Sequence, residues 1–239
     1  PASSVPGRKV HKCNRGRRMI VSHRHRFIFV KTHKTAGSSL EVALARECAA
    51  EDVVSHMEDN LDSGVPRNHG PDARLGGPYR RSRLLRKLVH RHSPLLGAYY
   101  YEHMPAWRIR ELVGDRTWNA YFTFCVERNP WDKTVSYYLW KRHGQGRRMP
   151  PFADWVLRRS HRLPVDSRLY CDREGRAMVD RIYEFRELPS ALAELRRRLG
   201  LTLPEPLPRE TAAVAPGRRP YTAYYDAATR PCVTKRVTR

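Results

Sequence analysis

The sequence predicts an α/β domain with a central parallel sheet flanked by helices. Two segments predict this class. An apolar run at 27–30 breaks into a polar turn and then a periodic helix from Leu40, and the run at 121–126 repeats that plan. Strands that alternate with helices are joined by crossover connections, which bring the carboxyl ends of the strands to one edge of a sheet. We therefore expect both polar turns at the same edge.

Apolar periodicity, prolines and glycines then set the expected elements in chain order. The first half has a strand at 26–30, a helix at about 38–49, a Gly/Pro-rich loop at 63–78 and a helix from Pro105 to Val113. The second half has a strand–helix unit at 121–142 that is ended by Gly144–Gly146, and a helix at 152–159. A further helix starts at Leu188, with apolar positions 192, 195 and 199, and a proline-rich loop follows at 203–220.

Length and composition indicate one domain. The chain has 239 residues with 40% hydrophobic content, which suits a single substantial core. Residues 1–18 are polar and basic and are expected to be a disordered extension, with Met19 a candidate start. Residues 19–239 are expected to form the domain. No apolar span of 18 residues and no secretory signal are evident.

The first turn has the residues that an anion site needs. A helix N-terminus leaves backbone N–H groups unpaired and carries partial positive charge. Gly37 allows close approach, Lys34 supplies a cation, and Thr35, Ser38 and Ser39 supply hydroxyl donors. Lys34 precedes the glycine, whereas the triphosphate loop G-x-x-x-x-G-K-[ST] places lysine after it. This order weakens an ATPase or GTPase interpretation.

The segment Lys34-Thr35-Ala36-Gly37-Ser38-Ser39 after a strand resembles the 5′-phosphosulfate loop of sulfotransferases that use 3′-phosphoadenylyl sulfate (PAPS). Arg128, followed eight residues later by Ser136, resembles the 3′-phosphate-binding pair of that family, with Asn129–Asp132 between them. Segments 179–184 and 224–226 look like later landmarks of bacterial carbohydrate-type members. The resemblance runs from Met19 to about Tyr225.

This resemblance implies a P-loop-like three-layer fold that binds PAPS without a metal and transfers a sulfuryl group to an acceptor hydroxyl, with carbohydrate sulfation the expected role. The implied cofactor-binding residues are Lys31, Lys34, Thr35, Ala36, Gly37, Ser38, Ser39, Arg128 and Ser136. Family members usually continue into a terminal helix with further apolar residues, so the basic end at 235–239 is expected to be shortened or diverged.

Sulfuryl transfer needs an activated oxygen and a stabilised leaving phosphate. We expect Lys34 to stabilise the departing 5′-phosphate, with Lys31 as a second charge. His103 occupies a place similar to the catalytic histidine of polysaccharide 2-O-sulfotransferases, and an imidazole suits deprotonation of an alcohol near neutral pH. The other candidates for the base are Glu102, His33 and His56.

Charge and cysteine content limit which binding partners and which cellular compartment we expect for the protein. The net charge of +22 favours polyanions, and a basic helical face at 80–92 could contact an anionic polysaccharide or a membrane surface. Nucleic acid is not expected, since no binding motif for it appears.

Five widely spaced cysteines without a C-x-x-C pair favour a reducing cytoplasm and argue against a metal site. A nucleotide kinase or NTPase and a non-catalytic polyanion-binding protein remain alternatives.

Overall fold

The computed structural model describes residues 19–35, 37–54, 82, 84, 100, 103–145, 149–207 and 219–237. Several sequence predictions lie outside these residues. They are the extension at 1–18, the loop at 63–78, nearly all of the basic face at 80–92, the central part of the loop at 203–220, and residues Ala36, His56 and Glu102.

The described strands form one mixed five-stranded sheet in the order β3-β1-β2-β4-β5. The strands are β1 (Ile20–Ser22), β2 (Phe27–Phe29), β3 (Val53–Val54), β4 (Phe122–Glu127) and β5 (Arg181–Glu184). Neighbours β2, β4 and β5 are parallel, while β1 runs antiparallel to both β2 and β3. The expected parallel sheet is correct for β2, β4 and β5, and the two polar turns follow β2 and β4. It is wrong for β1, because β1 and β2 are joined by a short hairpin rather than a crossover.

The carboxylate of Asp52 stabilises this hairpin. It accepts hydrogen bonds from the Ser22 hydroxyl at 2.9 Å and from the backbone N–H groups of His23 at 2.5 Å, Arg24 at 3.0 Å and Ala49 at 2.9 Å. Burial would raise the pKa of Asp52, but these hydrogen bonds outweigh burial and lower it. One side chain therefore joins the β1–β2 turn to the segment that follows the first helix.

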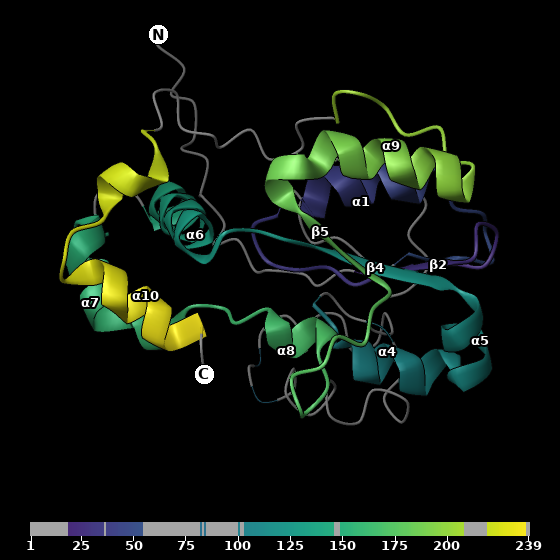
Figure 1. Ribbon diagram of the computed structural model, residues 1–239, viewed down its shortest axis with the longest axis horizontal. Helices are drawn as coiled ribbons and strands as arrows, with labels where there is room; N and C mark the ends of the chain where they lie inside the picture. The colour runs from purple at the N-terminus through teal and green to yellow at the C-terminus, as the bar shows by residue number, and fades with distance from the viewer. Residues whose placement is uncertain are drawn as a thin grey trace, which may run out of the picture.

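Helices cover both faces of the sheet (Figure 1). One face carries α1 (Gly37–Arg46) and α9 (Leu188–Leu199), and the other carries α4 (Ala106–Val113), α5 (Asp115–Ala120) and the short α8 (Ser167–Tyr170). Side chains alternate along each strand, so Phe27, Phe29 and Phe124 are buried toward α1 and α9, whereas Ile28 and Cys125 are buried toward α4 and α5. The chain is thus an α/β protein.

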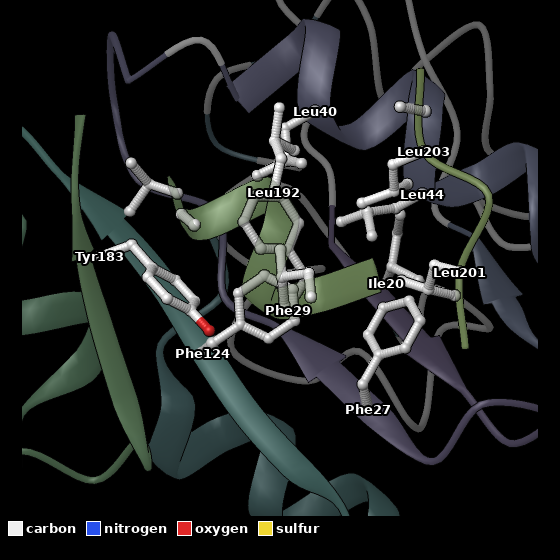
Figure 2. Close-up of a cluster of buried hydrophobic side chains, with 14 of the residues drawn as sticks. Ile20, Phe27, Phe29, Leu40, Leu44, Phe124, Tyr183, Leu192, Leu201 and Leu203 are labelled. Carbon is white, nitrogen blue, oxygen red and sulfur yellow. The ribbon is translucent and has the colours of Figure 1, made fainter. Parts of the chain in front are cut away.

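The α1/α9 side of the core is aromatic and aliphatic (Figure 2). Leu40 and Leu44 of α1 and Leu192 of α9 lie over the phenylalanine side chains of the sheet. Leu195, also on α9, is fully buried in the same cluster. This packing fixes where α1 begins, and therefore where the preceding turn lies.

A separate cluster joins α6 (Pro130–Gln145), α7 (Phe152–Arg159) and α10 (Thr229–Val237). Val135 and Tyr138 of α6, Trp155 of α7 and Val233 of α10 form its buried centre. Residues 235–237 of the basic end lie in α10, and α10 packs on α6 and α7.

Several expected element bounds are close to the observed ones. The helices at 152–159 and from Leu188 are confirmed, and Leu192 and Leu195 are buried as their spacing predicts. Helix α1 ends at Arg46, three residues before its expected end, and α6 continues to Gln145. Helix α6 therefore ends within the segment Gly144–Gly146 that was expected to stop it. Short 3-10 turns at 160–162, 185–187 and 221–224 complete the described elements.

Candidate functional site

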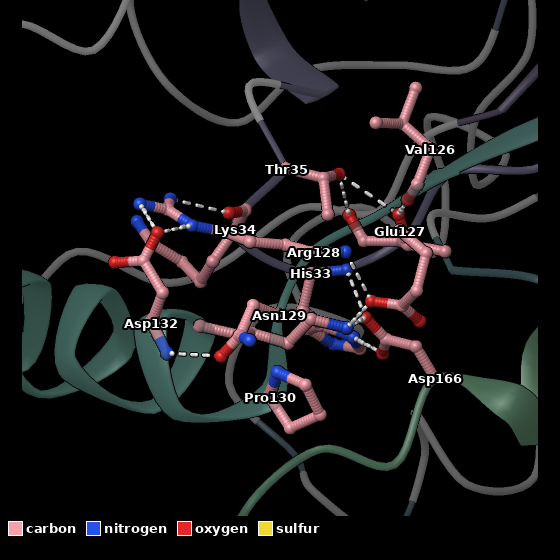
Figure 3. Close-up of polar contacts among 12 residues, drawn as sticks. His33, Lys34, Thr35, Val126, Glu127, Arg128, Asn129, Pro130, Asp132 and Asp166 are labelled. Carbon is pink, nitrogen blue, oxygen red and sulfur yellow. Dashed lines mark hydrogen bonds and ion pairs between the residues drawn. The ribbon is translucent and has the colours of Figure 1, made fainter. Parts of the chain in front are cut away.

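The two polar turns lie side by side at the carboxyl edge of the parallel strands. Strands β2 and β4 are paired through Phe29 and Phe124, and the Val30 N–H donates to the Phe124 carbonyl at 2.9 Å. Directly beyond this pairing, the Arg128 Nη1 donates to the Lys34 carbonyl at 3.0 Å (Figure 3). The expectation that both turns share one edge is therefore correct, and a hydrogen bond joins them.

Two threonine side chains stabilise the first turn. The Thr32 hydroxyl lies 2.9 Å from the Thr35 hydroxyl and donates to the Val126 carbonyl of β4, and both threonines are buried. Lys34 has φ of 59°. A left-handed backbone costs a residue other than glycine on the order of 1 kcal/mol, and such strain concentrates at functional sites. The threonine contacts hold the chain in this sharp turn immediately before α1.

The two lysines of this turn have different surroundings. Lys31 is 4% exposed, and its Nζ donates to Glu41 of α1 at 2.8 Å, so it forms a buried ion pair. Lys34 is half-buried, and its Nζ lies 5.1 Å from the centre of the Trp140 ring on α6. The Lys34 side chain therefore spans the space between the two turns, whereas Lys31 anchors the loop to α1.

Arg128 lies at the centre of the second turn and is 9% exposed. Its Nε and Nη2 each lie 2.8 Å from Oδ2 of Asp132, and its guanidinium lies 4.2 Å from the centre of the Phe185 ring, just beyond β5. The side chain is thus held by a carboxylate, a carbonyl and an aromatic face. This arrangement fixes the plane of a donor fork that suits phosphate oxygens.

The start of α6 is capped by Asn129. Its Oδ1 accepts from the backbone N–H groups of Trp131 at 3.1 Å and Asp132 at 3.3 Å, and Pro130 occupies the first helical position (Figure 3). Residues four apart share a helix face, so Ser136 lies in the same row as Asp132, and Trp140 follows it. Ser136 therefore lies on the side of α6 that holds Lys34, and Arg128, which precedes the helix, contacts Asp132 of the same row.

Two histidines stack beside the first turn. The rings of His33 and His103 have centroids 3.6 Å apart and planes 16° apart. The His103 Nδ1 lies 2.9 Å from the Lys31 carbonyl, which can only accept, so Nδ1 carries the proton in this contact. His103 also has a left-handed backbone, with φ of 51°. The predicted base thus lies against a second histidine that sequence reasoning ranked below it.

Asp166 connects His33 to a buried charge network. Its carboxylate accepts from the His33 backbone N–H at 2.7 Å and lies 2.5 Å from the His33 Nδ1 and 2.8 Å from the Lys133 Nζ. Lys133 also donates to Glu127, which accepts from the Tyr170 hydroxyl at 3.1 Å. Burial would raise the pKa of Asp166, but the hydrogen bonds and charges of His33 and Lys133 hold it well below its usual range.

A cavity of about 200 Å³ adjoins this network. The residues that line it include Glu127, Lys133 and Asp166, together with Tyr137 and Tyr170. The cavity therefore combines aromatic surface with hydrogen-bonding groups, as small-molecule sites commonly do. Arg128 also contributes to its wall and so links the cavity to the two turns.

The described part of the chain brings together Lys31, Lys34, Thr35, Arg128 and His103, and it places Gly37, Ser38 and Ser39 in the first turn of α1. Sequence reasoning missed Lys133, Trp140, Asp166 and Phe185. Lys133 follows the quoted motif directly and could have been found from its position. Asp166 is an isolated carboxylate in a loop, so only the tertiary structure identifies it.

Within the described ranges, no group of three or more His, Cys, Asp or Glu side chains is arranged to hold a metal ion.

A protein of Archaeoglobus fulgidus, described only as an uncharacterized protein, is 34% identical to this chain over 100 residues. The match covers 41% of this chain and 83% of that protein. The two proteins belong to one family. No family model matches the chain, and no solved structure matches it. Among the helices that the structure describes, none is long and apolar enough to cross a membrane.

Proposed function

We propose that this protein is a PAPS-dependent O-sulfotransferase with a P-loop-like three-layer fold. The observation that carries the proposal is the 3.0 Å hydrogen bond from the Arg128 guanidinium to the Lys34 carbonyl. It joins the two segments that resemble the 5′-phosphosulfate and 3′-phosphate motifs. A nucleotide with phosphates on both the 5′ and 3′ positions of one ribose requires two anion sites that are close together.

Helix dipoles and side-chain charges support this ligand class. Helices α1 and α6 both begin at this edge of the sheet, and helix N-termini favour anions. The proposed 5′-phosphosulfate site comprises the start of α1 with Lys34, Thr35, Ala36, Gly37, Ser38 and Ser39. The proposed 3′-phosphate site comprises Arg128 and Ser136. On binding, the 3′-phosphate shares the Arg128 guanidinium with Asp132, which already orients it.

Lys34 is proposed to stabilise the leaving 5′-phosphate. Its ammonium lies on the face of Trp140, where a cation is held by a weak and adaptable contact. A phosphosulfate at the start of α1 offers a stronger partner on the same side of the loop. Lys31, by contrast, is buried against Glu41, and this contact favours a role in holding the loop over a direct role as a second charge.

The acceptor is proposed to be a carbohydrate hydroxyl. The cavity beside Asp166 has aromatic and hydrogen-bonding walls that suit a sugar ring, and the net charge of +22 favours an anionic polysaccharide over a neutral glycan. Nucleic acid is not proposed as a partner. We propose the cytoplasm as the compartment, which agrees with the free thiols of the four described cysteines.

Calorimetric titration with 3′-phosphoadenosine 5′-phosphate (PAP), beside AMP and ATP and with and without Mg²⁺, tests the proposal. We expect metal-independent binding of PAP and much weaker binding of AMP, because AMP lacks the 3′-phosphate. Tight, Mg²⁺-dependent binding of ATP would instead indicate a nucleotide kinase or NTPase. Equal affinity for all three nucleotides, or no binding, would contradict a PAPS site.

A further inference from the structure

The stacked histidine pair provides two candidate bases, and their surroundings differ. We propose that His33 is the general base and that Asp166 is the residue that positions it. This inference rests on the proposed function, because it names the base of that same site. It places the base one residue before Lys34, on the turn that is proposed to hold the sulfuryl donor.

Asp166 holds His33 at two points. One carboxylate oxygen accepts from the His33 backbone N–H at 2.7 Å, and the other lies 2.5 Å from the ring Nδ1. An ionised carboxylate only accepts hydrogen bonds, so the proton of the neutral ring is on Nδ1, and Nε2 has the lone pair that a base needs. The His33 side chain is 31% exposed, whereas the Asp166 side chain is fully buried. The ring is therefore accessible from outside, whereas the carboxylate is enclosed by protein.

The carboxylate beside His33 favours that ring as the base. A base that removes a proton becomes an imidazolium, and a carboxylate beside the ring stabilises that charge. Protonated His33 would be neutralised by Asp166. The Nδ1 of His103 instead contacts the Lys31 carbonyl, and a protonated His103 would also lie face to face with His33. His103 therefore acts as a positioning residue, because its ring fixes the plane of His33.

Lys133 keeps Asp166 in the charged form. Its ammonium lies 2.8 Å from Oδ2 of the carboxylate and is itself shared with Glu127, while Oδ1 of the same carboxylate lies at the His33 ring. The lowered pKa of Asp166 agrees with this geometry. Asp166 thus remains a carboxylate through the reaction and does not take up the proton.

The proposed step couples deprotonation of the acceptor to transfer of the sulfuryl group. The acceptor hydroxyl gives its proton to the His33 Nε2 while its oxygen attacks the sulfur of PAPS. The bond between sulfur and the bridging oxygen of the 5′-phosphate breaks, and its electron pair remains on that phosphate as PAP forms. A sulfate ester is released, and the imidazolium then loses its proton to water.

The test compares His33→Gln, His103→Gln and Asp166→Asn with the wild type. PAP release from PAPS is measured in buffer containing a mixture of monosaccharides, so that water and sugar hydroxyls both serve as acceptors. General-base catalysis contributes about 10²–10⁴-fold, so His33→Gln should lower the maximal rate by about that factor and leave PAP affinity unchanged. Asp166→Asn should lower the maximal rate by about tenfold or more and change the pH profile of the rate. His23→Gln is the matched control, because this exposed histidine lies in the β1–β2 turn, away from the site.

The possible outcomes separate this inference from the proposed function. Failure of the wild type to bind PAP would overturn the proposed function. Binding of PAP, together with full activity of His33→Gln or a larger loss in His103→Gln, would overturn the base assignment alone. Binding of PAP with no release of PAP from PAPS by the wild type would also overturn it, because a competent base should at least activate water. An unchanged pH profile in Asp166→Asn would contradict the positioning role of that residue.

Discussion

At the residue scale, three cations at the carboxyl edge of the sheet lie against carboxylates. Lys31 is paired with Glu41, Arg128 with Asp132, and Lys133 with both Glu127 and Asp166. Removing a cation from water is costly unless a counter-charge accompanies it, so these pairs allow several positive groups to be buried together. An incoming phosphate therefore meets oriented donors, and the pairing carboxylates limit the net attraction.

Lys34 provides the first prediction. Lys34→Met should weaken PAP binding by about 10- to 100-fold, because a hydrogen bond to a charged group contributes about 1.5–3 kcal/mol. Methionine retains the length and apolar contact of the side chain against Trp140, so the free energy of unfolding should change little. Calorimetric titration measures the affinity, and Lys235→Met on the exposed side of α10 is the control. Equal PAP affinities for the two variants would exclude Lys34 from the site.

Asp52 provides a prediction about stability. Asp52→Ala should lower the free energy of unfolding by about 3 kcal/mol at neutral pH, because three backbone N–H groups and a hydroxyl lose a charged acceptor. Denaturant unfolding measures this loss, and Asp154→Ala at an exposed position of α7 should cost much less. Similar losses in both variants would show that the Asp52 contacts contribute little.

The pH dependence of the Asp52→Ala effect follows from the lowered pKa of Asp52. A carboxyl whose pKa is lower in the folded state stabilises the fold above its unfolded pKa of about 4, and this contribution is lost as pH falls through the folded pKa. The difference in unfolding free energy between wild type and variant should therefore be constant above pH about 4 and shrink below it. A difference that grew on acidification would contradict this sign.

At the scale of elements, the beginning of α6 positions the second anion site. Asn129 caps the helix, Pro130 occupies its first position, and Arg128 extends from the end of β4 toward the first turn. The strand, cap and helix thus leave Arg128 little freedom. The same geometry predicts that its guanidinium cannot be replaced by another cation.

Arg128→Lys should reduce the ratio of PAP affinity to AMP affinity by about tenfold or more, because an ammonium cannot supply the planar donor fork. AMP affinity should change much less, since AMP has no 3′-phosphate. Titrations with the two nucleotides give the ratio, and Arg181→Lys on the exposed side of β5 is the control. A ratio unchanged from wild type would show that Arg128 does not recognise the 3′-phosphate.

Helix α9 covers the sheet and should contribute strongly to stability. Leu195→Ala should lower the free energy of unfolding by about 2–5 kcal/mol, because Leu195 is fully buried in the α1/α9 cluster. Leu157→Ala, on the half-exposed side of α7, should cost about 0.5 kcal/mol or less. Chemical denaturation of both variants compares them directly. Comparable losses would contradict the assignment of Leu195 to the core.

The elements that could be predicted from the sequence are those marked by an apolar pattern with clear turn residues around it. The strand–turn–helix units around Lys34 and Arg128, and the helices at 152–159 and from Leu188, were evident from periodicity, prolines and glycines. Strands β1 and β3 were not. Strand β2 is as short as β1 but was found from the polar turn and helix that follow it, whereas β1 leads into a hairpin and β3 has only two residues. The antiparallel pairing of β1 with β2 depends on a turn that contains no glycine. Hydrogen bonds to the carboxylate of Asp52, which is distant in the sequence, stabilise this turn. Asp166 likewise reaches His33 only through tertiary contacts.

At the scale of the whole molecule, the fold brings segments far apart in the sequence to one edge of one sheet. The loop at 31–35 after β2, Arg128 after β4 and Phe185 after β5 follow three adjacent parallel strands. The loop with Asp166 then approaches from the α8 side. In open α/β sheets, ligands bind outside the carboxyl ends of the strands, and the candidate site lies at that position.

A crystal structure of the protein with bound PAP tests the central claim most directly, because the claim is that two turns bind two ends of one nucleotide. We predict the 5′-phosphate at the start of α1 within hydrogen-bonding distance of Lys34, and the 3′-phosphate on Arg128 and Ser136. The His33 ring should face the side of the 5′-phosphate from which an acceptor would approach. A nucleotide bound elsewhere, or one whose 3′-phosphate does not contact Arg128, would contradict the account.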